Sequence, residues 1–310
     1  MTVPIRPVFV LGPGRGGTTL LYKLLCLHRD VGFISTYDTR HFMQRFTGIA
    51  LRASRIHPLI RRRSWFSATG QAYSFKRHLL QRLVPTPTEG EKVFRDSGLT
   101  LDEYREQADG RTCEVLRNQL ERIQNRHRAQ VLVVKRTANN RRIPALEAAF
   151  PEARYVMIWR DGRAVAASLC EVNWWLNHGV WWADNRTPRQ IARNREEMLE
   201  IAARNWVEEA AAIERGLKRV DPGRVLTIRY ENLLADPDTA ISAVLRFAGL
   251  DVLANYLRAL RSIGLRPSTE RWRSRLSAQE VHAVERIQAQ WLQKLAYTAR
   301  RTRPETAASL

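Results

Sequence analysis

Cysteine is scarce in this chain, and its spacing argues against two kinds of scaffold. The 310 residues include three cysteines, Cys26, Cys113 and Cys170, and no C-x-x-C pair. Cysteines so widely spaced do not form the framework of a disulfide-rich domain, and they lack the ligand spacing of a structural zinc site. We therefore expect a metal-free protein that folds around a hydrophobic core in a reducing, cytoplasmic setting.

Long apolar runs are also missing. No uninterrupted apolar stretch approaches the ~20 residues that a membrane-spanning helix needs. The first strand-like run begins at Val8, which leaves no room for a signal peptide before it. The sequence thus predicts a protein without its own membrane span, although peripheral contact with a membrane surface stays open.

Acidic residues are outnumbered by basic ones, 31 to 51, and the formal net charge is +20. This surplus predicts anionic partners such as a phosphorylated cofactor, an acidic acceptor or an anionic lipid surface. A basic segment, Arg52–Arg63, is followed by Trp65, Phe66 and Tyr73. A solvated basic helix face, an acceptor site and a membrane contact are all compatible with it. Nucleic acid is not expected, because the chain has neither an RNA-binding sheet motif nor zinc-finger spacing.

The glycine-rich segment VFVLGPGRGGTTLL, residues 8–21, lacks the lysine of nucleoside triphosphatases. Their phosphate loop reads G-x-x-x-x-G-K-[ST]. Gly12 and Gly17 keep the spacing, but Thr18 stands at the lysine position and Arg15 is the cation inside the turn. The segment predicts a strand, a phosphate loop and a helix N-terminus that do not belong to a conventional ATPase.

Backbone and hydroxyl donors in this loop suit an anion. Gly14, Gly16 and Gly17 expose backbone N–H groups, and the following helix adds its dipole at the same point. Thr18 and Thr19 can donate their hydroxyls to the same oxygens. A glycine-rich turn that holds no ligand is the alternative.

Continuous apolar strands alternate with helical segments, which is typical of a parallel sheet. We expect strands at residues 8–11, 131–134, 155–159 and 225–228. The predicted fold is α/β, a three-layer parallel sheet flanked by helices and similar to P-loop NTPases. One domain is expected over residues 1–300, with a disordered tail at 301–310.

Arg160 directly follows the strand at 155–159, and Ser168 lies eight residues further along, in the next helix. The carboxyl ends of strands line the ligand crevice of open α/β sheets, so Arg160 is placed to bind a second phosphate. The turn Asp161–Arg163 is also compatible with a helix cap. Two phosphate subsites without the usual lysine point to a nucleotide bisphosphate.

Four segments in order carry a specific resemblance: RGGTTLLYKLLCLHRDVGF, VVKRT, FPEARYVMIWRDGRAVAASL and IRYENLLADP. Together they resemble the sulfotransferase family, and the match extends from Val8 to about Tyr297. The resemblance implies 3′-phosphoadenosine 5′-phosphosulfate as sulfuryl donor, adenosine 3′,5′-bisphosphate as product and no required metal ion. It implies transfer to a hydroxyl of a carbohydrate, lipid or small molecule.

The resemblance also assigns roles to individual residues. Lys135 resembles a lysine that reaches the transferred group, and Tyr230 resembles a tyrosine near the adenine. Arg160 and Ser168 resemble the pair that holds the 3′-phosphate, to which Arg271 is a further contributor. The loop that holds the 5′-phosphosulfate corresponds to Arg15, Gly16, Gly17, Thr18 and Thr19.

The general base departs from the family pattern. Cytosolic members have a histidine two residues beyond the lysine, where this chain has Thr137. Members of the tyrosylprotein type have a glutamate soon after the first helix, where this chain reads ISTYDTRH, residues 34–41. Asp38 is the first candidate base and His41 the second. The alternative for Asp38 is a role in a helix cap or turn, and the alternative for His41 is a surface residue.

A tryptophan-rich segment follows the helix of Ser168. It contains Trp174, Trp175, His178 and Trp181, which we expect to line the acceptor pocket because indoles stack on sugars and line hydrophobic sites. Packing of these aromatics onto the core is the equally supported alternative. The sequence does not identify the acceptor or the oligomeric state.

A P-loop kinase or other nucleotide-binding phosphotransferase, with an arginine in place of the Walker lysine, is the rival function. It would bind ATP with magnesium, whereas a sulfotransferase would bind the bisphosphate.

Overall fold

The computed structural model describes residues 5–38, 49–50, 53–54, 57–66, 84–99, 108–266 and 270–297. The chain forms two compact units. The first, the sheet unit, comprises Met1–Arg160 and Ala211–Ser268, and the second, the helical unit, comprises Asp161–Ala210 and Thr269–Leu310. Outside the described residues lie His41, Arg52, Arg55, Tyr73 and the tail at 301–310.

The sheet unit contains a five-stranded sheet in the order β2-β3-β1-β4-β5, with every neighbouring pair parallel. The four strands expected from the sequence are present, and the short β2 was not anticipated. The strands are β1 (Pro7–Leu11), β2 (Val31–Phe33), β3 (Val131–Lys135), β4 (Arg154–Trp159) and β5 (Val225–Arg229).

β1 is the central strand of the sheet, and its place determines where the site forms. The chain passes to β3 and β2 on one side of β1 and to β4 and β5 on the other. In the register, Val10 lies beside Lys135, Leu11 beside Met157, and Trp159 beside Arg229. Because the strands are parallel, the segments that follow β1, β3, β4 and β5 emerge at one edge of the sheet, at a topological switch point.

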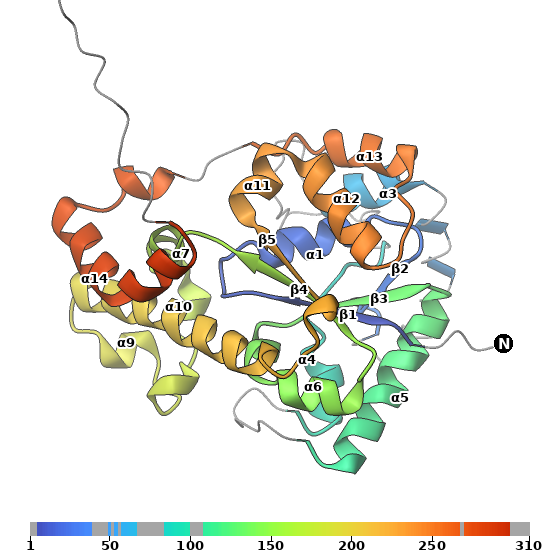
Figure 1. Cartoon of the computed structure of the whole chain (residues 1–310), viewed down its shortest axis with the longest axis horizontal. Helices are drawn as coiled ribbons and strands as arrows, with labels where there is room; N and C mark the ends of the chain where they lie inside the picture. Colours follow the sequence, from blue (N-terminus) through green and yellow to red (C-terminus); the bar gives the residue numbers. More distant parts are fainter. Residues whose placement is uncertain are drawn as a thin grey trace, which may run out of the picture. The chain divides into compact units, whose positions relative to one another are not determined.

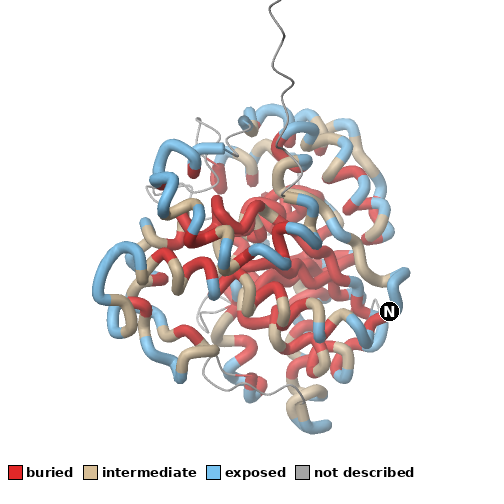
Figure 2. The backbone as a smooth tube through the Cα atoms, turned by 60° about the vertical axis from the view of Figure 1, so that its left-hand side comes forward, coloured by how far each residue is buried: buried red, intermediate tan, exposed pale blue. Residues whose placement is uncertain are grey.

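Helices cover both faces of this sheet, which confirms the predicted three-layer architecture. Helices α1 and α12 lie on one face, and α5 and α6 lie on the other (Figure 1). Strands β1 to β4 are buried except at Arg154 (Figure 2), which is why they read as nearly continuous apolar runs, whereas β5 at the edge of the sheet is only partly buried. The helical segments of this unit are α1 (Thr18–Cys26), α3 (Pro58–Trp65), α4 (Glu91–Asp96), α5 (Gly110–His127), η3 (Thr137–Arg141), α6 (Ile143–Ala149), η5 (Pro222–Arg224), α11 (Tyr230–Ala235), α12 (Pro237–Phe247) and α13 (Ala254–Arg261).

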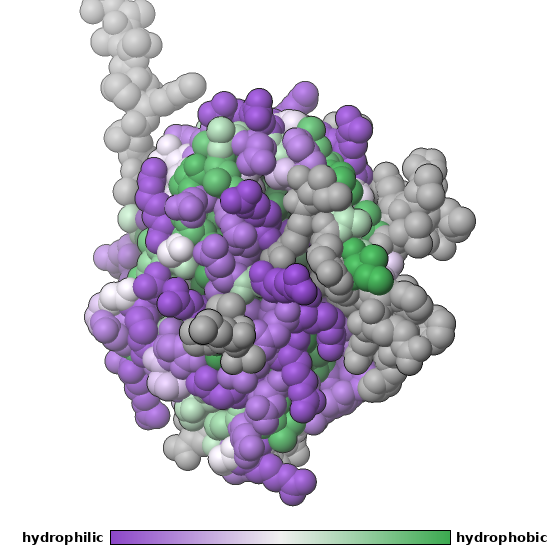
Figure 3. Space-filling view, turned by 90° about the vertical axis from the view of Figure 1, so that its right-hand side faces the viewer, coloured by the Kyte–Doolittle hydropathy of each residue, from purple (hydrophilic) through white to green (hydrophobic). Residues whose placement is uncertain are grey.

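The described side chains on the side shown in Figure 3 are mainly hydrophilic. Purple side chains dominate there, and green, apolar areas lie between them. None of the helices in the described part of the chain is both long and apolar enough to cross a membrane.

The helical unit is held together by buried polar contacts. Gln288 donates to the carbonyl oxygens of Gly162 at 3.1 Å and Ala203 at 3.3 Å. These bonds join three helices of the unit. Its helical segments are α7 (Gly162–Leu169), α8 (Asn173–Leu176), η4 (Trp181–Ala183), α9 (Pro188–Ile191), the first part of α10 (Arg195–Leu217), η6 (Arg271–Ser274) and α14 (Ala278–Lys294).

Candidate functional site

The loop after β1 presents backbone donors to a ligand. Gly17 adopts the left-handed conformation and is the N-cap of α1, whose first turn contains no acidic residue and receives no side-chain cap from the described residues. The N–H groups of that turn and the helix dipole therefore favour an anion at this point. Thr18 is 3% exposed and Thr19 is half-buried. The local structure has the form that the sequence predicted.

Arg15 occupies a strained position in the same loop. Its φ of 63° lies in the left-handed region, which non-glycine residues adopt rarely and which is often found at functional sites. The turn around it is closed by the N–H of Gly16, which donates to the Pro13 carbonyl oxygen at 2.9 Å. The Arg15 carbonyl oxygen accepts a hydrogen bond from Nη1 of Arg160, also at 2.9 Å. The loop is thus hydrogen-bonded to Arg160, the residue that follows β4.

Tyr230 completes this contact from the end of β5. The Arg160 guanidinium carbon lies 4.6 Å from the centroid of the Tyr230 ring. The same ring covers Gly17, where a Cβ atom would come within 2.3 Å of Tyr230 Cδ2. The structure therefore brings Arg160, Tyr230 and the loop together, as the sequence led us to expect, and it leaves room at Gly17 only for glycine.

Lys135 ends β3, the strand next to β1. Its side chain is 4% exposed, and its Nζ forms an ion pair with Glu89 and lies 3.3 Å from Thr137 Oγ1. The second carboxylate oxygen of Glu89 accepts from the Thr137 N–H at 3.2 Å. The lysine thus lies beside the phosphate loop with a carboxylate as its counter-ion.

Asn140 clamps the start of the phosphate loop. Its side chain accepts from the Gly12 N–H at 3.1 Å and donates to the Gly12 carbonyl oxygen at 2.9 Å. Asn140 is completely buried and lies in η3, just after β3. This pair of bonds connects the segment that carries Lys135 to the loop that would hold the anion.

We predict that Asn140→Ala lowers the free energy of unfolding by about 3 kcal/mol, because two buried backbone groups of Gly12 lose their partner. Thermal melting measures this loss, and weaker binding of adenosine 3′,5′-bisphosphate should accompany it. Asn139→Ala is the matched control, since the buried Asn139 amide makes no hydrogen bond to the described residues. An equal loss of stability in both variants would contradict the clamp.

Asp38, the first candidate base, is engaged in a buried polar network. Its carboxylate accepts from the Ser35 N–H at 2.9 Å and from Ser35 Oγ at 2.5 Å. It forms an ion pair with Arg126, and His127 Nε2 lies 3.7 Å away. Burial opposes ionisation, but His127 and the Ser35 donors outweigh it, so the pKa of Asp38 lies below its ordinary value.

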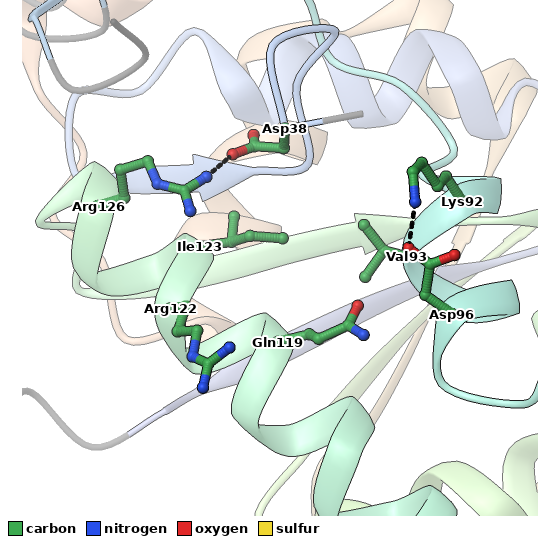
Figure 4. Close-up of a pocket in the computed structure, with 8 residues that line it drawn as sticks. All are labelled: Asp38, Lys92, Val93, Asp96, Gln119, Arg122, Ile123 and Arg126. Carbon is green, nitrogen blue, oxygen red and sulfur yellow. Dashed lines mark hydrogen bonds and ion pairs between the residues drawn. The ribbon is translucent and has the colours of Figure 1, made fainter. Parts of the chain in front are cut away.

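This carboxylate lies at a small polar cavity. The cavity has a volume of about 230 Å³, and Figure 4 shows the Asp38–Arg126 pair and a second pair, Lys92–Asp96, on its walls. The Asp38 side chain itself is 1% exposed. Asp38 lies in a turn, and its role as a base stays a prediction.

Three further candidates lie in the helical unit. Ser168 is half-buried on α7, Arg271 is exposed at the start of η6, and His178 is exposed after α8. Their assignments to the 3′-phosphate and the acceptor stay predictions from the sequence.

The tryptophans of the helical unit differ in their exposure. Trp175 is 4% exposed, and Trp181 Nε1 donates to Glu209 Oε1 at 2.9 Å. Trp182 Nε1 donates to Asn205 Oδ1 at 3.1 Å. Trp174, in contrast, is 58% exposed. Of these four, Trp174 has the most exposed side chain, and the acceptor role of Trp174, Trp175 and Trp181 stays a prediction.

Sequence reasoning missed Glu89 and Asn140. Glu89 lies in the segment PTPTEG, residues 85–90, whose composition indicates only a loop. Asn140 follows VVKRT by three residues, and nothing in its local pattern indicates a contact with Gly12. Strand pairing between β1 and β3 was the one signal that could have placed Asn140 near the loop.

Comparison with known proteins agrees with this geometry. The chain is 25% identical over 277 residues to the omega-hydroxy-beta-dihydromenaquinone-9 sulfotransferases Stf3 of Mycobacterium bovis and Mycobacterium tuberculosis. The match covers 82% of this chain and 66% of each relative, so the chain spans slightly less than two thirds of their length.

Solved structures share the fold at lower identity. Sulfotransferase STF9 from Mycobacterium avium superimposes with a TM-score of 0.58 and 20% identity, over 94% of this chain and 77% of that one. The sulfotransferase domain of the curacin biosynthetic pathway gives a TM-score of 0.50 and 14% identity, over 92% and 96% of the two chains. The model of the sulfotransferase family matches residues 7–254, which include the phosphate loop, Lys135, Arg160 and Tyr230, and the chain therefore belongs to that family.

Proposed function

We propose that this protein transfers a sulfuryl group from 3′-phosphoadenosine 5′-phosphosulfate to an acceptor hydroxyl. One observation carries the proposal: a phosphate loop with Thr18 in place of the Walker lysine shares a sheet edge with Lys135 and Arg160. A lysine is thus supplied from the neighbouring strand β3 instead of from the loop. The rival, a phosphotransferase, is not favoured, because the family is that of sulfotransferases.

The residues present fit the sulfated end of such a donor. The open N–H groups at the start of α1 and the hydroxyls of Thr18 and Thr19 would hold its 5′-phosphate. Arg15 and Lys135 would stabilise charge on the equatorial and leaving oxygens as the acceptor attacks in line. The acceptor oxygen bonds to sulfur, the bond from sulfur to the phosphate oxygen breaks, and adenosine 3′,5′-bisphosphate leaves with the electron pair.

The nucleoside end would be held by the contact between Arg160 and Tyr230. We assign Arg160, with Ser168 and Arg271, to the 3′-phosphate and Tyr230 to the adenine. The Arg160 guanidinium is stacked on the Tyr230 ring and bonded to the loop, so its orientation is set before a ligand arrives.

We expect Arg160→Ala to weaken binding of adenosine 3′,5′-bisphosphate roughly 30-fold, the loss of one charge-assisted contact. Isothermal titration calorimetry measures it. Arg154→Ala is the matched control, because Arg154 begins the same strand at the opposite edge of the sheet. Unchanged affinity in Arg160→Ala would show that Arg160 does not bind the donor.

For the acceptor we propose the hydroxyl of a lipid, carbohydrate or other small molecule. The curated relatives are named for a menaquinone-derived acceptor, which supports a lipid. Within the basic segment Arg52–Arg63, Arg61 is buried and donates to the Cys26 carbonyl oxygen at 2.8 Å, so it is the exposed Arg63 that would then contact an anionic membrane surface.

Incubation with radiolabelled donor and a cell extract, followed by identification of the labelled product, tests the function. Thermal stabilisation by adenosine 3′,5′-bisphosphate but not by ATP with magnesium is the expected accompanying result. Stabilisation by ATP with magnesium alone would favour the phosphotransferase.

A further inference from the structure

The counter-ion of Lys135 is supplied by a segment remote in sequence. Glu89 precedes Lys135 by 46 residues and contacts both its Nζ and the backbone N–H of Thr137. Because Lys135 ends the strand beside β1, this carboxylate lies at the same sheet edge as the phosphate loop. The contact therefore belongs to the region where the sulfuryl group would be transferred.

Backbone contacts fix the chain immediately before Glu89. The Thr88 N–H donates to the Ile34 carbonyl oxygen at 2.8 Å, beyond the end of β2. The Thr88 carbonyl oxygen accepts from the hydroxyl of Tyr22 at 3.2 Å, and Tyr22 belongs to the helix that follows the phosphate loop. The backbone next to Glu89 is thus bonded to the residue that follows β2 and to α1, the helix that follows the phosphate loop.

The chain immediately after Glu89 is fixed as well. Gly90 has a φ of 67° and packs against the Ile34 side chain, so close that a Cβ atom would come within 2.6 Å of it. Glu91 forms a two-pronged ion pair with the buried guanidinium of Arg136, with both N–O distances 2.7 Å. Arg136 directly follows Lys135, so this pair aligns the segment of Glu89 with the end of β3.

The Glu89 side chain is half exposed, unlike that of Asp38. The Glu89 side chain is 49% exposed, whereas the Lys135 side chain beside it is 4% exposed and the Asp38 side chain is 1% exposed. A half-exposed side chain whose backbone is held on both sides can come within hydrogen-bond reach of an acceptor hydroxyl, as a general base must.

The charged and titratable groups facing Glu89 are Lys135, Arg136 and Tyr22. Burial of part of the side chain raises the pKa of Glu89, but the charge and hydrogen bond of Lys135 outweigh it, and the pKa lies below its ordinary value. The carboxylate is ionised near neutral pH and is held by the lysine in the free protein.

We propose that Glu89 is the general base and that Lys135 releases it when the donor binds. In the free protein Lys135 neutralises Glu89; with donor bound, Lys135 turns to the sulfuryl oxygens. Glu89 then accepts the acceptor's hydroxyl proton as that oxygen bonds to sulfur, and the bond from sulfur to the bisphosphate breaks with its electron pair. This inference rests on the proposed sulfuryl transfer and adds that the base is competent only beside bound donor.

The test is Glu89→Gln, assayed for transfer of label from radiolabelled donor to one fixed lipid extract. We expect the rate at saturating donor to fall roughly 100-fold, as for loss of a general base. The decrease in rate at low pH that protonation of Glu89 causes should also disappear from the pH profile. Calorimetry should show that adenosine 3′,5′-bisphosphate binds at least as tightly as to the wild type, because Lys135 has lost its competitor. Glu89→Asp should recover part of the rate.

Asp96→Asn is the matched control, because Asp96 is a carboxylate on the adjoining α4 that pairs with Lys92 and should tolerate the change. Loss of nucleotide affinity in Glu89→Gln, in step with the rate, would show a structural role and overturn the proposal. The proposal would also be overturned if Glu89→Gln kept full activity while Asp38→Asn still bound the nucleotide but transferred label slowly. Failure of the proposed function can be distinguished from failure of the Glu89 proposal, because the wild type itself would then neither bind the bisphosphate nor transfer label.

Discussion

Replacing Gly17 with alanine is expected to reduce affinity for adenosine 3′,5′-bisphosphate by roughly 150-fold, equivalent to about 3 kcal/mol. Two costs combine. The φ of 96° at Gly17 is unfavourable for any residue with a Cβ atom, and that atom would come within 2.3 Å of the Tyr230 ring. Moving the ring would also disturb Arg160, which is stacked on it. Calorimetry on the folded variant measures the loss.

Gly14→Ala in the same loop is the matched control, and its effect should be far smaller. No atom lies within 4 Å of the position that a Cβ of Gly14 would occupy, and its φ is not positive. The double variant Gly17→Ala with Tyr230→Ala separates the two costs at Gly17, because removing the ring relieves the contact but not the backbone strain. Equal losses in Gly14→Ala and Gly17→Ala would contradict this account.

Features of the site that depend on strand ends could be predicted from the sequence. The residues directly before Gly12, Lys135 and Arg160 form buried apolar runs because helices cover both faces of the sheet, and each run can be recognised in the sequence by itself. Parallel strands then place their carboxyl ends at one edge without any knowledge of side-chain contacts. This argument placed the loop and Arg160 at one edge, whereas Lys135 and Tyr230 were assigned to the site by family resemblance, and the roles of all of them stay predictions.

Contacts between segments remote in sequence could not be predicted in this way. Glu89 reaches Lys135 only because Tyr22, Ile34 and Arg136 hold its backbone, and none of these bonds has a local sequence pattern. Asp38 occupied the position that family resemblance favoured, yet its ion pair with Arg126 spans 88 residues of sequence. A carboxylate's place in the chain therefore says less about its availability than the partners that the fold supplies.

Lys135→Met is expected to slow transfer by roughly 1000-fold, the upper range for removing one donor that stabilises transition-state charge. Methionine retains most of the buried stem, so the fold should survive the change, and melting temperature checks this. Lys92→Met on α4, which removes a lysine that pairs with Asp96, is the matched control and should leave the rate nearly unchanged. A decrease of less than tenfold in the transfer rate of Lys135→Met would show that Lys135 does not stabilise the transition state.

The pH dependence and the double variant then test whether Lys135 and Glu89 act as one unit. Lys135 depresses the pKa of Glu89 in the free protein, so removing the lysine should raise that pKa and shift the acid limb of the residual kcat/KM, which reports the free enzyme, to higher pH. If the two residues serve the same step, adding Glu89→Gln to Lys135→Met should cost much less than the roughly 100-fold expected in the wild type. Full additivity would mean that Lys135 and Glu89 contribute independently, which would contradict their action as one unit.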